Sequence, residues 1–103
     1  MIIYNVTINI DESIHDDWLL WMTNTHIPEV MKSKMFLAAK MSKVIVTEPL
    51  GGITYSIQYS CENKTKLDQY QKQFEEKIET KHKEKFQNKF VAFPSLLRIV
   101  KEF

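Results

Sequence analysis

Two stretches of this chain alternate between apolar and polar residues, and their polar positions carry amides and hydroxyls but no charge. These polar rows are Asn5, Thr7 and Asn9 in the first stretch, and Thr54, Ser56, Gln58 and Ser60 in the second. A period of two is typical of a β-strand with one face packed on a core. Because lysine and glutamate are plentiful elsewhere, we expect the polar rows to lie on a sheltered surface: a cavity, an interface or the floor of a ligand site.

The composition limits the classes of protein to consider. A length of 103 residues fits a single domain spanning residues 1–103. The formal net charge is +1, and Arg98 is the only arginine among 14 basic residues, which argues against a nucleic-acid partner. The sequence has no basic leader and no apolar run of membrane-spanning length, so no membrane partner is expected. Cys61 is the single cysteine, which favours a cytoplasmic protein without disulfides.

The remaining patterns predict the element order β-α-β-β-α-β. Strands are expected at residues 2–10, 35–47, 53–61 and about 89–100, with a glycine-containing turn at residues 48–52. A capping box of Ser13 and Asp16 is expected to begin the first helix. His26-Ile27-Pro28 is expected to interrupt that helix with a bend, and Pro28 is expected in the first turn of a further short helical turn at residues 29–32. Asn63 is a candidate cap for the second helix, and Thr65 with Asp68 is a competing capping box. This order predicts an α+β, ferredoxin-like domain: a four-stranded antiparallel sheet with two helices on one face.

The last predicted strand is apolar on both faces. Its apolar residues are Phe90, Val91, Ala92, Phe93, Leu96, Leu97, Ile99 and Val100. Pro94 has no backbone N–H to donate, and a central strand needs such donors on both sides. The strand is therefore expected at an edge of the sheet. An uncovered apolar edge strand invites aggregation unless something pairs with it. We therefore expect a second copy to cover the outer face, giving a homodimer that encloses the polar rows or continues into a closed dimeric α/β barrel.

Four segments carry a resemblance to known proteins. They are WLLWM at residues 18–22, HIPEVM at 26–31, TYSIQY at 54–59 and KFVAF at 89–93. Across nearly the whole chain the sequence resembles a small bacterial family of unknown function. The layout is more distantly similar to the dimeric α/β-barrel superfamily, which includes cofactor-independent antibiotic-biosynthesis monooxygenases, haem-degrading monooxygenases and stress-responsive proteins. This resemblance implies the fold and the dimer, whereas a shared fold by itself does not assign an activity.

His26 and Asn5 are the candidate catalytic residues. An imidazole at a helix bend can act as a base near neutral pH, although His26 could equally satisfy backbone carbonyls at the break. Amides such as that of Asn5 can orient a carbonyl or stabilise an enolate. Asn9, Ser56 and Gln58 could bind a ligand in the same way, or bind water between subunits.

Trp18, Trp21 and His82 are further candidates for ligand binding. The two indoles either line a pocket for a flat apolar ligand or belong to the core and the dimer contact. His82 continues the inward stripe of the second helix. In haem-degrading relatives a histidine on that helix binds iron, but the spacing from Tyr70 to His82 departs from their pattern.

No cofactor or metal is predicted. The three histidines are dispersed along the chain and the single cysteine adds no metal-ligand spacing, while both glycines belong to one turn rather than to a phosphate loop.

Three hypotheses for the function follow. The first is a homodimeric small-molecule-binding or stress-type protein that uses the polar rows for a small apolar ligand. The second is a cofactor-independent monooxygenase or isomerase acting on a flat apolar substrate, with His26 as base and Asn5 as orienting amide. The third is a structural or protein-interaction module whose polar rows are a hydrated interface.

Overall fold

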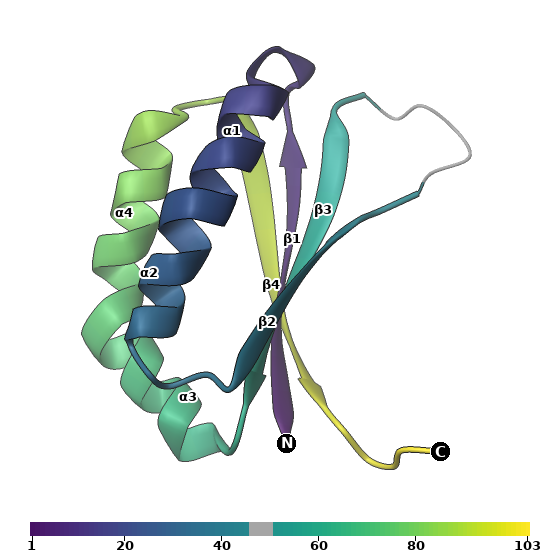
Figure 1. Cartoon of the computed structure of the whole chain (residues 1–103), viewed down its shortest axis with the longest axis vertical. Helices are drawn as coiled ribbons and strands as arrows, with labels where there is room; N and C mark the ends of the chain where they lie inside the picture. The colour runs from purple at the N-terminus through teal and green to yellow at the C-terminus, as the bar shows by residue number, and fades with distance from the viewer. Residues whose placement is uncertain (46–50) are drawn as a thin grey trace.

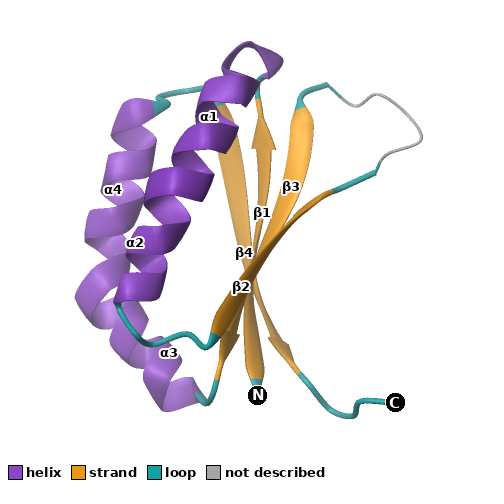
Figure 2. Cartoon of the chain, viewed as in Figure 1, coloured by secondary structure: helices purple, strands orange, loops and turns teal. Residues whose placement is uncertain are grey.

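The computed structural model describes residues 1–45 and 51–103 (Figure 1). Four strands form one antiparallel sheet in the order β2-β3-β1-β4. Their bounds are β1 Ile2–Ile10, β2 Ala38–Lys43, β3 Ile53–Cys61 and β4 Phe90–Arg98. The helices cover one face of the sheet and leave the other face open (Figure 2). The predicted ferredoxin-like order is confirmed, with the two alternating strands at the centre.

The first helical segment follows β1. It consists of a 3₁₀ turn at Glu12–Ile14, α1 at His15–Trp21, a π-helical turn at Met22–His26 and α2 at Ile27–Lys32. The predicted capping box is wrong, because Asp11 Oδ1 accepts the backbone N–H of Ser13 at 2.9 Å and so caps the segment.

Pro28 lies in the first turn of α2, as the sequence predicts. The predicted interruption before it takes the form of the π-helical turn at Met22–His26, through which the chain stays helical. Proline donates no backbone hydrogen bond, and in an α-helix its ring clashes with the carbonyl four residues earlier. The wider π-helical turn at Met22–His26 accommodates the proline while the chain stays helical.

The second helical segment connects β3 to β4. It consists of α3 at Lys64–Tyr70, a second π-helical turn at Gln71–Glu75 and α4 at Glu76–Lys85. The predicted cap is confirmed, since Asn63 Oδ1 accepts the backbone N–H of Lys66 at 2.9 Å. Both helical segments therefore carry one π-helical turn near the middle of their length.

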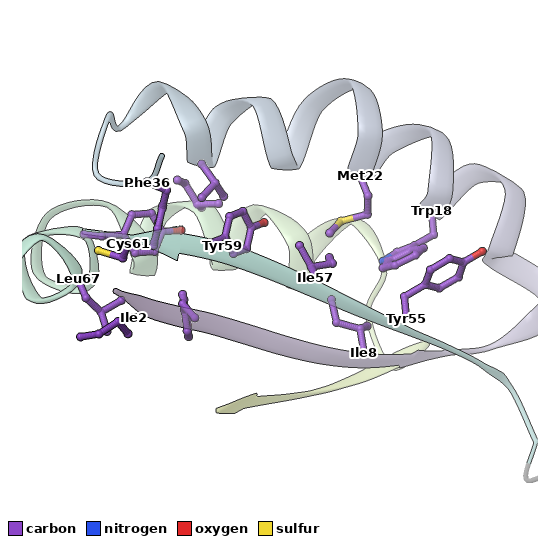
Figure 3. Packing of buried hydrophobic residues seen from close by; sticks show 14 of the residues in the cluster. Ile2, Ile8, Trp18, Met22, Phe36, Tyr55, Ile57, Tyr59, Cys61 and Leu67 are labelled. Carbon is purple, nitrogen blue, oxygen red and sulfur yellow. The ribbon is translucent and has the colours of Figure 1, made fainter. Parts of the chain in front are cut away.

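The core lies between the helices and the apolar faces of β1 and β3 (Figure 3). Trp18, Met22 and Leu67 from the helices are fully buried against it. The strands contribute Ile2, Tyr4, Ile8, Ile10, Tyr55, Ile57, Tyr59 and Cys61, all of them buried. The apolar half of each alternating pattern therefore faces the helices, and the polar half faces away from them.

The sequence predicted the position of edge strand β4 correctly but overestimated the length of edge strand β2. β2 is shorter than the predicted strand at residues 35–47. It begins at Ala38 and ends at Lys43, and the backbone N–H of Val44 then donates to the Thr54 carbonyl at 2.8 Å. Residues 46–50, which include part of that strand and of the predicted turn, lie outside the described residues. β4 lies at the opposite edge as predicted, where Pro94 can be accommodated.

The two glycines before β3 provide a test of this turn. Both have positive φ angles, +82° at Gly51 and +72° at Gly52. A Cβ atom on Gly52 would lie 2.6 Å from Asn9 Oδ1 and 2.7 Å from the Ile10 carbonyl, whereas one on Gly51 would meet nothing within 4 Å. We expect Gly51→Ala to cost about 1–2 kcal/mol of unfolding free energy for its backbone conformation. Gly52→Ala should cost clearly more. Urea denaturation of both variants measures this difference, and equal losses would contradict the close approach at Gly52.

Candidate functional site

The sheet divides the predicted site residues into two groups. Residues paired across β1 and β3 share a face, and the pairs include Asn5 with Gln58, Thr7 with Ser56 and Asn9 with Thr54. The polar rows therefore lie side by side on the open face. His26, which belongs to the helical layer, lies on the covered face. Within one chain, the structure does not bring the two proposed catalytic residues, Asn5 and His26, together.

On the open face, the polar rows form a hydrogen-bonded network of uncharged groups. The Ser56 hydroxyl donates to Asn5 Oδ1 at 2.6 Å, and Asn5 Nδ2 donates to the hydroxyls of Thr7 at 3.3 Å and Ser95 at 3.2 Å. Asn9 Nδ2 donates to Thr54 Oγ1 at 3.0 Å. These bonds orient the amides in advance, which is a useful property for a surface that must recognise hydroxyl or carbonyl groups.

Apolar side chains of β4 border the polar rows. Val91, Phe93 and Leu97 pair with Asn9, Thr7 and Ile3, so they lie on the open face as well. Their exposed fractions are 53%, 63% and 46%. Exposed apolar groups gathered beside a sheltered polar surface are typical of an interaction site.

On the covered face, a histidine cluster joins the two helical segments. It consists of His26 from the first π-helical turn, and Glu79 and His82 from α4. The Glu79 carboxylate lies between the two imidazoles, with Oε1 at 3.6 Å from His26 Nε2 and Oε2 at 3.7 Å from His82 Nδ1. Both histidines are buried, at 4% and 1% exposure, while the Glu79 side chain retains 34%.

Trp18 determines the tautomer of His82. The indole N–H of Trp18 donates to His82 Nε2 at 3.0 Å, so that nitrogen is the acceptor. A neutral imidazole then carries its proton on Nδ1, which faces Glu79. Within the described residues, His82 Nδ1 is buried without a hydrogen-bond partner, at a distance from Glu79 that is longer than a hydrogen bond.

The electrostatics of the cluster favour a neutral His26 beside a charged Glu79. Burial lowers the pKa of His26 to about 4, although the negative charge of Glu79 opposes this effect. Burial raises the pKa of Glu79, but the neighbouring side chains of His82, His26 and Lys83 outweigh this effect and hold the pKa below its ordinary value.

Trp21 connects the histidine cluster to the surface. Its ring centroid lies 5.4 Å from that of His26, 5.5 Å from that of His82 and 5.6 Å from that of Phe86. Trp21 and Phe86 also line a surface groove of about 560 Å³ between the first helical segment and the end of α4. Trp18, by contrast, is fully buried and belongs to the core. Of the two indoles proposed to bind a ligand, Trp21 lines a groove and Trp18 does not.

Sequence reasoning missed Glu79 and His15. Glu79 belongs to a run of charged residues of the kind that usually faces solvent, yet it lies between the two buried histidines. The segment Glu79-Thr80-Lys81-His82 has the Glu-x-x-His spacing that places both side chains on one helix face, and this signal could have found the pair. His15 stands beside two acidic residues in the sequence, and its Nε2 lies 2.7 Å from the Tyr55 hydroxyl.

The prediction of no metal site rested on the dispersed histidines, and the structure corrects that premise. One potential ligand atom from each of His26, Glu79 and His82 lies within 4.8 Å of the others. The fold therefore brings together residues that are far apart in the sequence.

The depressed pKa of His26 predicts an acid-sensitive fold. The unfolded chain binds a proton to His26 below about pH 6.5, while the folded chain does so only near pH 4. The free energy of unfolding should therefore fall as the pH decreases through this window, by about 3 kcal/mol at most from this residue. Urea denaturation between pH 7 and pH 4.5, in the presence of a chelator, measures the decline. In His26→Gln the same interval should show a clearly smaller slope, and an unchanged slope would assign the effect to other groups.

Comparisons with known proteins agree with this architecture. Residues 1–100 match the family model described as domain of unknown function (DUF4286). No curated protein matches the sequence. None of the helices in residues 1–45 and 51–103 combines the length and the apolar character needed to cross a membrane.

Solved structures with the same fold share little sequence with this chain. A dimeric ferredoxin-like protein from an uncultured marine organism has a TM-score of 0.79 and 11% identity, over 99% of this chain and 97% of its own. SnoaB, a cofactor-independent oxygenase from Streptomyces nogalater, has a TM-score of 0.68 and 8% identity, over 98% and 95%. A de novo designed protein reaches 0.63 with 10% identity, over 95% and 97%. At these identities the similarity shows the fold alone.

Proposed function

This chain belongs to the family described as domain of unknown function (DUF4286), and we propose that it is a homodimeric small-molecule-binding protein whose ligand site is formed by the open faces of two sheets. The observation that carries the proposal is the uncharged network of the polar rows, bordered by the exposed apolar side chains of β4. A solvated sheet face would ordinarily carry charges.

A second copy of the chain is the partner that fits the open face best. Phe93, Val91 and Leu97 expose apolar surface that a partner would remove from water. In a two-fold dimer the same surface serves both copies, so the apolar side chains along β4 and the polar rows beside them would belong to one shared contact. A structurally similar protein is described as dimeric, which supports this arrangement. Facing copies would enclose the polar rows of both chains between two sheets.

The chemical class of the ligand is inferred from the groups that would surround it in the dimer. The polar rows supply amide and hydroxyl groups, and β4 supplies apolar surface from Phe93 and Val91. A small, mostly apolar molecule with hydroxyl or carbonyl groups suits such a lining. The polar rows carry no charge of their own, and Lys40 of β2, which pairs with Gln58 on the same face, could offer a positive charge only at one side of the site. A cationic ligand buried there would find no opposite charge in the polar rows. A cytoplasmic location is proposed as well, which is compatible with the free, buried thiol of Cys61.

The oxygenase or isomerase hypothesis needs a base and an orienting amide at one substrate. The similarity to a cofactor-independent oxygenase supports the fold of such an enzyme. Asn5 and His26, however, lie on opposite faces of the sheet, so one substrate in one chain would not meet both. The binding function therefore has the stronger geometric support.

Charge placed on the open face should dissociate the dimer. We expect the double variant Phe93→Lys/Leu97→Lys to raise the dimer dissociation constant roughly a hundredfold or more, since like charges then face each other across a two-fold interface. The matched control is Leu20→Lys, which changes a residue of 63% exposure on α1, away from the open face. Sedimentation velocity at micromolar concentration measures both. A monomeric wild-type chain, or equal dissociation in the control, would refute the proposed interface.

Native mass spectrometry of protein purified without added ligand tests the binding function. We expect a dimer that carries a reproducible small adduct. Gln58→Leu, which removes one amide from the polar rows at similar volume, should weaken retention of that adduct roughly tenfold. Gln71→Leu, on the exposed surface of the second helical segment, should leave it unchanged. An adduct-free wild-type dimer would instead support the structural-module hypothesis.

A further inference from the structure

We propose that His26, Glu79 and His82 form a binding site for a divalent transition-metal ion. Their three potential ligand atoms lie within 4.8 Å of one another. Two imidazoles and one carboxylate form a donor set that Zn²⁺ and Fe²⁺ use in proteins, with further positions left for water or another ligand. This site lies on the covered face of the sheet, and it does not depend on the proposed dimer or its ligand.

The backbone presents these donors from two directions. Glu79 and His82 are three residues apart on α4, so their side chains project from the same face of that helix. His26 approaches from the opposite side, at the end of the π-helical turn before α2. π-Helical turns occur frequently at functional sites because they change the direction of a side chain without ending the helix. The site is thus formed by the contact between the two helical segments.

The unpartnered nitrogen of His82 is an independent indication of a ligand. Among the described residues, Nδ1 has no hydrogen-bond partner although His82 is 99% buried, given its exposure of 1%. Such a buried polar atom is costly, and native structures usually satisfy it. A metal ion between His82 Nδ1 and the Glu79 carboxylate would supply the missing interaction. Because the Glu79 side chain is 34% exposed, the ion also has a path from solvent.

Metal binding at this site competes with the hydrogen bond that Trp18 donates to His82. A neutral imidazole that binds a metal through Nδ1 carries its proton on Nε2. In this structure the indole N–H of Trp18 donates to that same Nε2 at 3.0 Å. The two N–H groups cannot point at each other, so metal binding at His82 must break the Trp18 hydrogen bond. Binding transfers the His82 proton from Nδ1 to Nε2 through solvent, with no change of net charge on the imidazole.

Binding of Co²⁺ and Zn²⁺ to the chelator-treated chain tests the site. Titration calorimetry should show one saturable site per chain, and bound Co²⁺ should show visible absorption that identifies its coordination. His26→Gln and Glu79→Gln should each weaken binding roughly tenfold or more, because each removes a ligand. The matched controls are His15→Gln and Glu76→Gln, which change the remaining histidine and an exposed acid on α4. Circular dichroism verifies that each variant is folded.

Two outcomes would overturn the proposal. One is the absence of saturable binding by the folded wild-type chain. The other is binding that His15→Gln weakens as much as His26→Gln does, because the binding would then not be specific to the site formed by His26, Glu79 and His82.

Trp18→Phe tests the competition with the indole. Removing the N–H frees His82 to take the metal-binding tautomer, so we expect Zn²⁺ to bind several-fold more tightly to the folded variant. Unchanged or weaker binding would show that Trp18 does not oppose the metal. In the wild-type chain, the tryptophan fluorescence should change on addition of Zn²⁺ as the indole loses its acceptor, and in Glu79→Gln the same change should require a roughly tenfold higher Zn²⁺ concentration or more.

Discussion

The register between β1 and β3 is the constraint on which both faces of this molecule depend. It sets Asn5 opposite Gln58 and Tyr4 opposite Tyr59, so one face of the central strands is polar and the other is packed. A slip of one residue would exchange the two faces along the whole strand. The open surface and the hydrophobic core are therefore specified together, and burial of the apolar row holds the polar row in place.

The covered face contains buried polar contacts as well as the hydrophobic core. Two polar contacts link its elements. The Tyr4 hydroxyl of β1 donates to Glu75 of the second helical segment, and Trp18 of α1 donates to His82 of α4. Burial raises the pKa of Tyr4, with the Glu75 hydrogen bond adding to the effect, because both favour the neutral phenol. The first contact constrains how the second helical segment packs on the sheet, and the second constrains how the two helical segments pack on each other.

The fold was largely predictable from the sequence, because alternation and turn residues act locally. Such signals predicted three features of the fold: the two alternating strands, the cap at Asn63 and the edge position of the strand that contains Pro94. The histidine cluster was not predictable in the same way. His26 and Glu79 meet only because two helical segments pack together, and a charged residue within a charged run has no local mark of burial.

The sequence predicted the position of Pro28 in a first helical turn, but not the form of the irregularity before it. Local rules predict an interruption before proline, whereas the structure keeps the helix continuous by widening one turn. The packing of α2 against its neighbours outweighs the local preference: Val30 is buried, and Lys81 of α4 reaches Glu29 at 2.8 Å. Tertiary contacts of this kind decide between a kink and a π-helical turn, and they are invisible in the local pattern.

The two π-helical turns make the length of each helical segment as important as its residues. A π-helical turn contains one residue more than the α-helical turn it replaces. Loss of a single residue within 22–26 would let that turn become α-helical, and the flanking side chains would keep their directions, because both kinds of turn complete one rotation. Loss of a residue between Trp18 and Trp21, where the helix is α-helical, would instead rotate the side chains beyond it by about 100° relative to Trp18. The sheet register would be untouched, yet His26 and Trp18 would no longer face the same neighbours. Insertions and deletions outside the π-helical turns would thus remodel the histidine cluster while leaving the sheet intact.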